Sequence, residues 1–186
     1  MTSHYFVTAA MAALALTGCG TAEDTTEPAP TETPVAEATT ATESPAAVTP
    51  QSFVDAAAAS DMFETESARV AQEKSQTPAV RDFAQMMIDD HSTSTESLRQ
   101  AAGQVEGVTV SPKMTPDQQQ KLTALRDAPA EQFDALYKQQ QVAAHEQALQ
   151  LMQNYAEAGQ SEPLTGFAST TAPVIERHLG VARELP

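Results

Sequence analysis

The feature of this sequence that most constrains its fold is the recurrence of apolar residues at intervals of three and four along residues 51–186. Within residues 78–102 this spacing is followed by Val80, Phe83, Ala84, Met87, Leu98 and Ala102. Within residues 130–158 it is followed by Phe133, Leu136, Tyr137, Ala144, Ala148, Leu151 and Tyr155. Because residues three and four apart share one face of an α-helix, this spacing predicts long amphipathic helices that each bury one face.

Capping and turn residues mark where these helices begin and end. Thr-Pro pairs at 49–50, 77–78 and 115–116 each place an N-cap residue before a proline at the first helical position. Gly103, Gly107 and Gly159 mark helix ends. We therefore predict long helices near 51–75, 78–102, 130–158 and 163–184, and a short one near 116–127. Four long helices joined mostly by short turns indicate an all-α fold, an up-down four-helix bundle with the extra short helix in the long connection between its second and third helices.

The N-terminal residues have the pattern of a bacterial lipoprotein signal. Phe6 to Leu16 is an uncharged apolar run that suits a secretory signal and is too short to span a bilayer. The tetrad Leu16-Thr17-Gly18-Cys19 that overlaps its end resembles a lipobox, in which a peptidase cuts before the cysteine and the thiol carries the lipid, commonly with palmitate. Cys19 is the only cysteine of the chain, so no internal disulfide can form. We predict that residues 1–18 are a lipoprotein signal peptide and that Cys19 is lipidated.

The residues after Cys19 predict a tether, and Gly20 predicts the location of the protein in the cell envelope. From residue 21 to residue 50 the sequence is dominated by Ala, Thr, Glu and Pro, and it holds six acidic residues and neither Lys nor Arg. Such a segment cannot bury enough apolar surface to fold, so residues 19–50 are predicted to be a lipidated cysteine and a disordered acidic tether. By the sorting pattern of lipoproteins, Gly20 rather than Asp implies the periplasmic face of the outer membrane. Residues 51–186 are the predicted helical domain.

The charge balance limits the partners of the chain. Its 25 acidic and 10 basic residues give a formal net charge of -15, and it has no Trp. Nucleic-acid binding needs a basic face or stacking aromatics, so this composition argues against nucleic acid as a partner. Acidic lipid headgroups would also repel the chain. The expected partners are the membrane, through the anchor at Cys19, and an envelope protein or a second copy of the chain.

Any chemistry of the predicted bundle lies in three histidines and two glutamates. His91, His145 and His178 stand one each on three of the long helices, and each follows a branched apolar residue by three positions. We therefore expect each imidazole to face the core. In the first helix, Glu66 lies on an apolar stripe, with Glu64 on the adjoining face. Glu66, His91 and His145 lie near the midpoints of their helices and are expected to share one layer, whereas His178 is expected roughly 7.5 Å from that level.

Short motifs spread over residues 51–184 resemble a bacterial envelope family, the ferritin-like domain of unknown function 4142. The motifs are Glu64 and Glu66, Ala84-Gln85-Met86-Met87, Asp90-His91, Phe133-Asp134, Tyr137, His145, Phe167-Ala168, Pro173 and His178-Leu179. Ala172, where the family usually has Leu, is a departure that bears on local packing. The resemblance implies a ferritin-like four-helix bundle, and the family has no established biochemical role.

A ferritin-like fold can hold two iron ions, but this sequence argues against a di-iron centre. Such a centre needs Glu-x-x-His motifs on two helices, and the sequence contains none. The corresponding positions hold Ile88, Val142 and Ile175. The cofactor is therefore unknown, and one transition-metal ion held by the three histidines with Glu64 or Glu66 is one hypothesis, because imidazole and carboxylate suit such ions.

Two other hypotheses stand beside a metal site. The histidines could form a purely structural buried network with carboxylates, in which Asp90, Asp134 and Tyr137 would take part. They could alternatively transfer protons in catalysis. No Gly-rich phosphate loop or nucleophile elbow is found, so we expect a non-enzymatic protein. The sequence thus predicts a lipid-anchored envelope protein with a binding, structural or stress-related role, with metal storage, buffering or carriage as the alternative.

Overall fold

The computed structural model of the chain describes residues 48–186, which form five α-helices. Their bounds are α1 (Pro50–Lys74), α2 (Pro78–Ala102), α3 (Pro116–Asp127), α4 (Ala130–Ala158) and α5 (Glu162–Glu184). The predicted all-α architecture is confirmed, and every predicted helix bound lies within one residue of the observed one. The predicted signal peptide, the lipidation site Cys19 and the tether up to residue 47 lie outside the described residues.

The three Thr-Pro pairs begin helices as predicted, but they are used in two ways. Thr49 and Thr115 are true caps, because the hydroxyl of each accepts a hydrogen bond from a backbone N–H of the first turn. Thr115 also completes a capping box with Gln118. The hydroxyl of Thr77 instead donates to Oδ2 of Asp134, at 2.5 Å. That bond joins the start of α2 to the first turns of α4.

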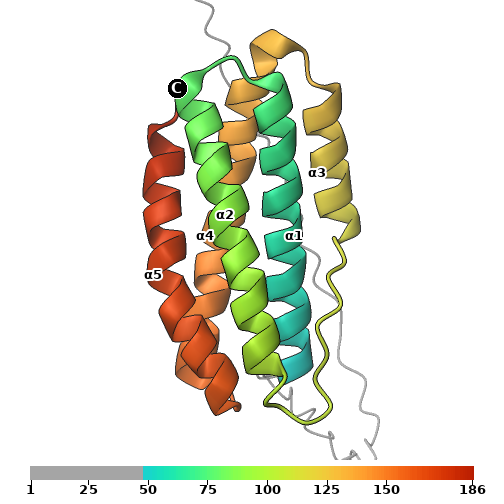
Figure 1. The fold of residues 1–186 in the computed structure, drawn as a ribbon, viewed down its shortest axis with the longest axis vertical. Coiled ribbons are helices and arrows are strands. Elements are labelled where there is room, and N and C mark those ends of the chain that lie inside the picture. The colour runs from blue at the N-terminus through green and yellow to red at the C-terminus, as the bar shows by residue number, and fades with distance from the viewer. Residues whose placement is uncertain (1–47) are drawn as a thin grey trace, which may run out of the picture. The chain divides into compact units, whose positions relative to one another are not determined.

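The four long helices form a bundle in which each has two neighbours (Figure 1). α1 packs beside α2 and α4, and α5 packs beside the same two helices. Three-residue turns join α1 to α2 and α4 to α5, so the helices of each pair are antiparallel. The long connection carries the chain back along the bundle, so α2 and α4 run in the same direction (Figure 1). One long crossover of this kind is the arrangement of ferritin-like folds.

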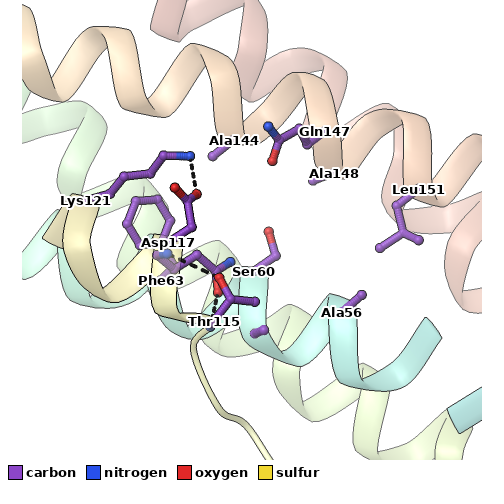
Figure 2. A pocket seen from close by; sticks show the side chains of 12 residues that line it. Ala56, Ser60, Phe63, Thr115, Asp117, Lys121, Ala144, Gln147, Ala148 and Leu151 are labelled. Carbon is purple, nitrogen blue, oxygen red and sulfur yellow. Dashed lines mark hydrogen bonds and ion pairs between the residues drawn. The ribbon is translucent and has the colours of Figure 1, made fainter. Parts of the chain in front are cut away.

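The connection between α2 and α4 is anchored to α1 along its length. The side chain of Gln51 bonds both backbone groups of Thr109, with N–O distances of 2.9 Å each. Further along, α3 packs against α1 and α4. Between these three helices lies a cavity of about 220 Å³ whose walls include small side chains such as Ala56 of α1 and Ala144 of α4 (Figure 2).

The buried core consists of two apolar clusters with a polar layer between them. One cluster is built around Phe53, Leu98, Tyr155 and Phe167, and the other around Phe63, Phe83, Phe133 and Tyr137. Between them along the helices lie the buried polar side chains Asp61, Glu64, His91, Gln141, His145 and His178. In the described range, no helix combines the length and the apolar character that a membrane span requires.

Candidate metal centre

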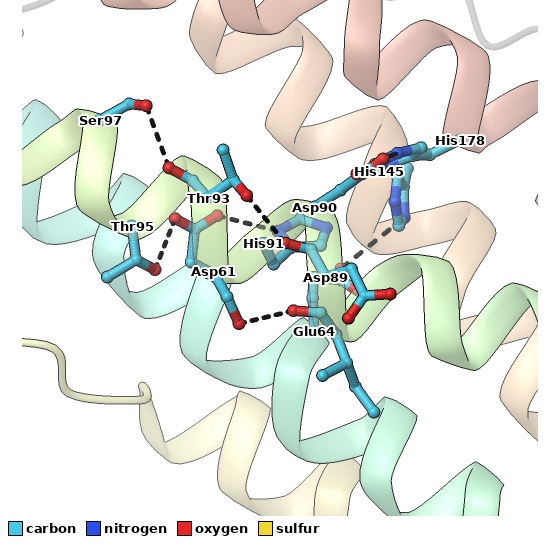
Figure 3. A network of polar contacts seen from close by, with 12 residues as sticks. Asp61, Glu64, Asp89, Asp90, His91, Thr93, Thr95, Ser97, His145 and His178 are labelled. Carbon is cyan, nitrogen blue, oxygen red and sulfur yellow. Dashed lines mark hydrogen bonds and ion pairs between the residues drawn. The ribbon is translucent and has the colours of Figure 1, made fainter.

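Three histidines from three different helices meet in the polar layer (Figure 3). His91 comes from α2, His145 from α4 and His178 from α5, and all three are buried. The ring centroid of His91 lies 5.9 Å from that of His145 and 5.7 Å from that of His178, and the His145 and His178 centroids are 5.7 Å apart. One nitrogen of each ring lies within 4.8 Å of the other two. We call these three residues the histidine cluster.

Each histidine uses one ring nitrogen to bond a fixed acceptor. Nδ1 of His91 donates to Oδ1 of Asp61 at 2.9 Å, and Nδ1 of His145 donates to the backbone oxygen of Gln141 at 2.8 Å. Nε2 of His178 donates to Oδ2 of Asp90 at 2.7 Å. Because all three partners are acceptors, the proton of each neutral ring lies on the nitrogen that bonds the partner.

Among the described residues, the opposite nitrogen of each ring has no hydrogen-bond partner. These atoms are Nε2 of His91, Nε2 of His145 and Nδ1 of His178. In a neutral ring each of them carries a lone pair, which can accept a proton or bind a metal ion. A ligand histidine typically donates its other ring N–H to a carboxylate or a backbone carbonyl, as all three do here.

Two members of the cluster are neutral at pH 7. Burial, together with the nearby charge of His91, lowers the pKa of His145 to about 3. Burial also lowers the pKa of His178, although its bond to Asp90 acts in the opposite direction. For His91, burial is outweighed by the hydrogen bond to Asp61 and by surrounding carboxylates, so its pKa is raised. His91 is thus the member of the cluster that protonates first.

The acceptors are themselves held in place. Oδ2 of Asp61 accepts a second hydrogen bond, from the hydroxyl of Thr95 at 3.0 Å. Asp90 is half-buried and forms an ion pair with Arg177 at 2.9 Å. Burial alone would raise the pKa of Asp90, but its bonds to His178 and Arg177 lower it, so the carboxylate stays ionised.

Glu64 is buried beside the cluster but outside it. Its Oε1 lies 3.7 Å from Nδ1 of His145, the ring nitrogen that bonds Gln141, and neither carboxyl oxygen has a hydrogen-bond partner among the described residues. Burial raises its pKa to about 7, against the effects of His91 and Gln141. Tyr137 is also buried, and burial together with the charge of Glu64 raises its pKa well above 10.

The sequence reason for this arrangement is visible in α1. Its core stripe runs through Val54, Ala57, Asp61, Glu64, Ala68 and Ala71, at intervals of three and four. Asp61 and Glu64 therefore occupy positions that elsewhere in the stripe are apolar. Asp61 was missed by the sequence analysis, although its place in the stripe was a usable signal. The acceptor for His145 is a backbone oxygen, which has no sequence signal.

Two predicted site residues lie away from the cluster. Glu66 was wrongly placed: it is half-buried and forms ion pairs with Arg69 and, at 3.9 Å, with Arg126 of α3. Residues 64 and 66 are roughly 200° apart around a helix, so burying Glu64 turns Glu66 toward α3. Asp134 accepts a hydrogen bond from Thr77 at the end of the bundle where α2 begins, away from the histidines. His178, by contrast, lies in the cluster rather than in a separate layer.

The fold and the site define a ferritin-like four-helix bundle with a buried three-histidine cluster. The sequence pattern of the family described as Domain of unknown function (DUF4142) matches residues 35–185, and the chain belongs to this family. The crystal structure of a DUF305 fragment from Deinococcus radiodurans has a similar fold, with a TM-score of 0.63 and 16% identity over 74% of this chain and 95% of that chain. No curated protein matches the chain.

Proposed function

We propose that this protein binds one divalent transition-metal ion through His91, His145 and His178. The observation that carries the proposal is that one nitrogen from each of the three buried rings lies within 4.8 Å of the other two, and that each ring has one nitrogen bonded to an acceptor and one without a partner among the described residues. Protein ligands hold Zn²⁺ at about 2.0–2.1 Å from each imidazole nitrogen, so nitrogens this close together need only small side-chain movements to share one ion.

A purely structural histidine network explains less of the site. It accounts for one nitrogen of each ring, through Asp61, Gln141 and Asp90. The other three nitrogens have no partner among the described residues, and a buried polar atom left without one costs about 1–3 kcal/mol. A hydrogen bond between two of the rings would still leave the free nitrogen of the third ring without a partner. One metal ion would satisfy all three.

The ligand chemistry favours a late first-row divalent ion. Imidazole nitrogens suit Zn²⁺, Cu²⁺, Ni²⁺ and Co²⁺, whereas Ca²⁺ and Mg²⁺ prefer oxygen ligands. The carboxylates of Asp61 and Asp90 stand directly behind two of the imidazoles and could balance the two positive charges of such an ion. Storage, buffering or carriage of the ion is the role that fits a bundle without catalytic motifs.

We further propose that the bundle is displayed in the cell envelope by a lipid anchor at Cys19. The support is the sequence Leu16-Thr17-Gly18-Cys19 and the acidic Pro-rich segment that follows it. A lipid at Cys19 would hold the bundle at the membrane without a membrane-spanning helix.

The metal proposal is tested by loading the purified protein with Zn²⁺, removing free ion, and measuring bound metal per chain by mass spectrometry together with the melting temperature. We expect close to one ion per chain and a rise in melting temperature, because a ligand that binds only the folded state at 100 times its Kd adds about 2.7 kcal/mol. His145→Gln should bind at least about 100-fold more weakly, since a metal ligand matters more than a residue that only orients one.

Glu66→Gln is the matched control, because Glu66 lies outside the cluster. It should retain one ion per chain with unchanged affinity. Metal content below about a tenth of an ion per chain in the wild-type protein after loading with Zn²⁺, Co²⁺ and Cu²⁺ would refute the proposal, since a functional site is largely occupied at ion concentrations above its Kd.

A further inference from the structure

A small cavity lies directly against two of the three histidines. It has a volume of about 20 Å³, and its walls include His91 and His178 together with Asp61, Ser94 and Thr171. A water molecule needs roughly 10–15 Å³ of such space. The cavity therefore has room for one water molecule or one atom-wide ligand beside the histidine cluster.

Among the described residues that line the cavity, the two carboxylates are already engaged and there is no further imidazole. Asp61 already accepts from His91 and Thr95, and Asp90 is bonded to His178 and Arg177. Glu64 lies near Nδ1 of His145, and it is not among the residues that line the cavity. Three imidazoles complete only three of the four positions that tetrahedral Zn²⁺ or Co²⁺ takes, and sites of this kind keep the fourth for water or an added ligand.

A polar groove on the surface between α2 and α5 adjoins this cavity. The groove has a volume of about 230 Å³ and shares Asp90, Ser94, Thr171 and Val174 with the cavity. Its other walls carry the hydroxyls of Thr93, Ser97 and Thr170 and the guanidinium of Arg177. Thr93, Ser97 and Asp90 can be followed along α2 in Figure 3. The half-buried Ser94 and Thr171 thus stand between solvent and the histidines.

We propose that the fourth coordination position of the metal is open, and that water or a slim monovalent anion reaches it through the α2–α5 groove past Ser94 and Thr171. This inference rests on the metal site proposed above. The size of the cavity sets the ligand class, because it admits a ligand one atom wide and excludes larger groups. Arg177 at the entrance is paired with Asp90 of the same groove, so the attraction for an anion comes from the metal ion itself.

The test uses the full chain loaded with Co²⁺, whose visible absorption changes when a ligand in its coordination sphere is exchanged. Titration of the wild-type protein with azide should change the spectrum saturably while one Co²⁺ stays bound. Thr171→Leu places a larger side chain at the entrance, and forcing it aside costs about 1–3 kcal/mol. We therefore expect azide to bind about 10–100-fold more weakly to this variant.

Three further variants separate access from fold. Thr171→Val removes the hydroxyl and leaves the width of the passage unchanged, and Ser169→Leu introduces the same leucine side chain at an exposed position of α5. Both should bind azide as the wild-type protein does. Ser94→Leu narrows the passage from α2 and takes the place of Thr171→Leu if that variant loses Co²⁺.

The possible failures are distinguishable. If the wild-type protein binds Co²⁺ but its spectrum does not respond to azide, the open position is overturned and the metal site stands. If the narrowed variants and the wild-type protein bind azide alike, the route past Ser94 and Thr171 is overturned. If Co²⁺ does not bind, and Zn²⁺ and Cu²⁺ do not bind either, the proposed function and this inference fail together.

Discussion

Two carboxyl groups that flank the histidine cluster hold different charges because their surroundings differ. Asp90 is half-buried and bonded to Arg177 and His178, which lower its pKa. Glu64 is fully buried, has no hydrogen-bond partner in the described part of the chain, and has a pKa raised to about 7. Asp90 therefore supplies a permanent negative charge near the cluster, whereas Glu64 is neutral below pH 7 and ionises only against the cost of burial.

This difference makes Glu64 a pH-dependent source of instability in the metal-free protein. Its pKa is 4.5 when unfolded and about 7 when folded, so it is protonated in both states below pH 4.5. Between these values the unfolded chain releases the proton that the folded chain keeps, and the unfolding free energy falls as pH rises. The loss is complete above pH 7 and amounts to about 3 kcal/mol. Glu64→Gln should remove this loss, so the unfolding free energy of the variant should rise relative to that of the wild-type protein from pH 4.5 to pH 8.

The measurement is urea unfolding of both proteins with chelator present, at a series of pH values. Glu66→Gln serves as the control, because the half-buried Glu66 is already paired with Arg69 and Arg126. Its stability should differ from that of the wild-type protein by a small amount that does not grow with pH. A constant difference between Glu64→Gln and the wild-type protein across the series would contradict the assignment of Glu64.

The sequence predicted single residues of the site where the helix face alone decides their position. The three histidines follow their apolar neighbours by three positions, and all three are buried as expected. The prediction for Glu66 failed because α1 has two buried faces, one toward the bundle centre and one toward α3, and the apolar pattern does not distinguish them. The acceptor that each histidine bonds depends on side-chain rotamers and, for His145, on a backbone oxygen. The pattern of apolar residues predicts neither.

At the scale of elements, the turns fix which residues share a level. Asp61 lies as far before the C-terminal end of α1 as His91 lies after the start of α2. Counting outward from the turn between these helices places both residues at the same height, where they bond. His145 lies equally far before the end of α4, and His178 lies slightly less than one helical turn farther from the start of α5. The remaining offset is roughly 4.5 Å, so counting from the turns rather than from helix midpoints removes much of the expected separation.

The turn between α4 and α5 therefore has to be tight, and Gly159 allows the close approach of the chain to Tyr155 that a tight turn requires. A Cβ at this position would lie 2.5 Å from the backbone oxygen of Tyr155 and 2.6 Å from its ring. Tyr155 cannot easily yield, because its ring stacks on Phe53 with centroids 3.8 Å apart. Gly159→Ala should lower the unfolding free energy by about 1–3 kcal/mol through this clash.

Gly180 provides the opposite case within α5. A Cβ there would meet no atom within 4 Å, and the residue lies in the helix interior. Gly180→Ala should therefore raise the unfolding free energy by about 0.5–1 kcal/mol. Denaturant unfolding of the two variants beside the wild-type protein checks both signs. Equal effects from the two substitutions would show that the α4–α5 turn does not depend on the close approach at Gly159.

For the whole molecule, the polar layer lowers the stability of the fold, and the fold does not need this layer in order to form. The apolar clusters on either side of it would form one continuous core if Asp61, Glu64 and the histidines were apolar. Buried polar groups with missing partners lower stability, and in native proteins they concentrate at functional sites. The bundle is predictable from sequence because its helices repeat one pattern. The site is predictable only as the place where that pattern is broken, and its pairings come from the packing of four helices.

The proposed place of the molecule in the cell gives a last prediction, which concerns residues before the bundle. If Cys19 carries the lipid, the full chain expressed in a bacterium with two membranes should incorporate labelled palmitate and sediment with the outer membrane. Cys19→Ser should abolish both, because no other thiol exists in the chain. Gly20→Asp keeps the cysteine and changes only the residue after it, so this variant should retain the label and move to the inner membrane. A wild-type chain that stays unlabelled, or a Cys19→Ser variant that remains labelled, would refute the anchor and leave the histidine cluster to be explained in a protein without one.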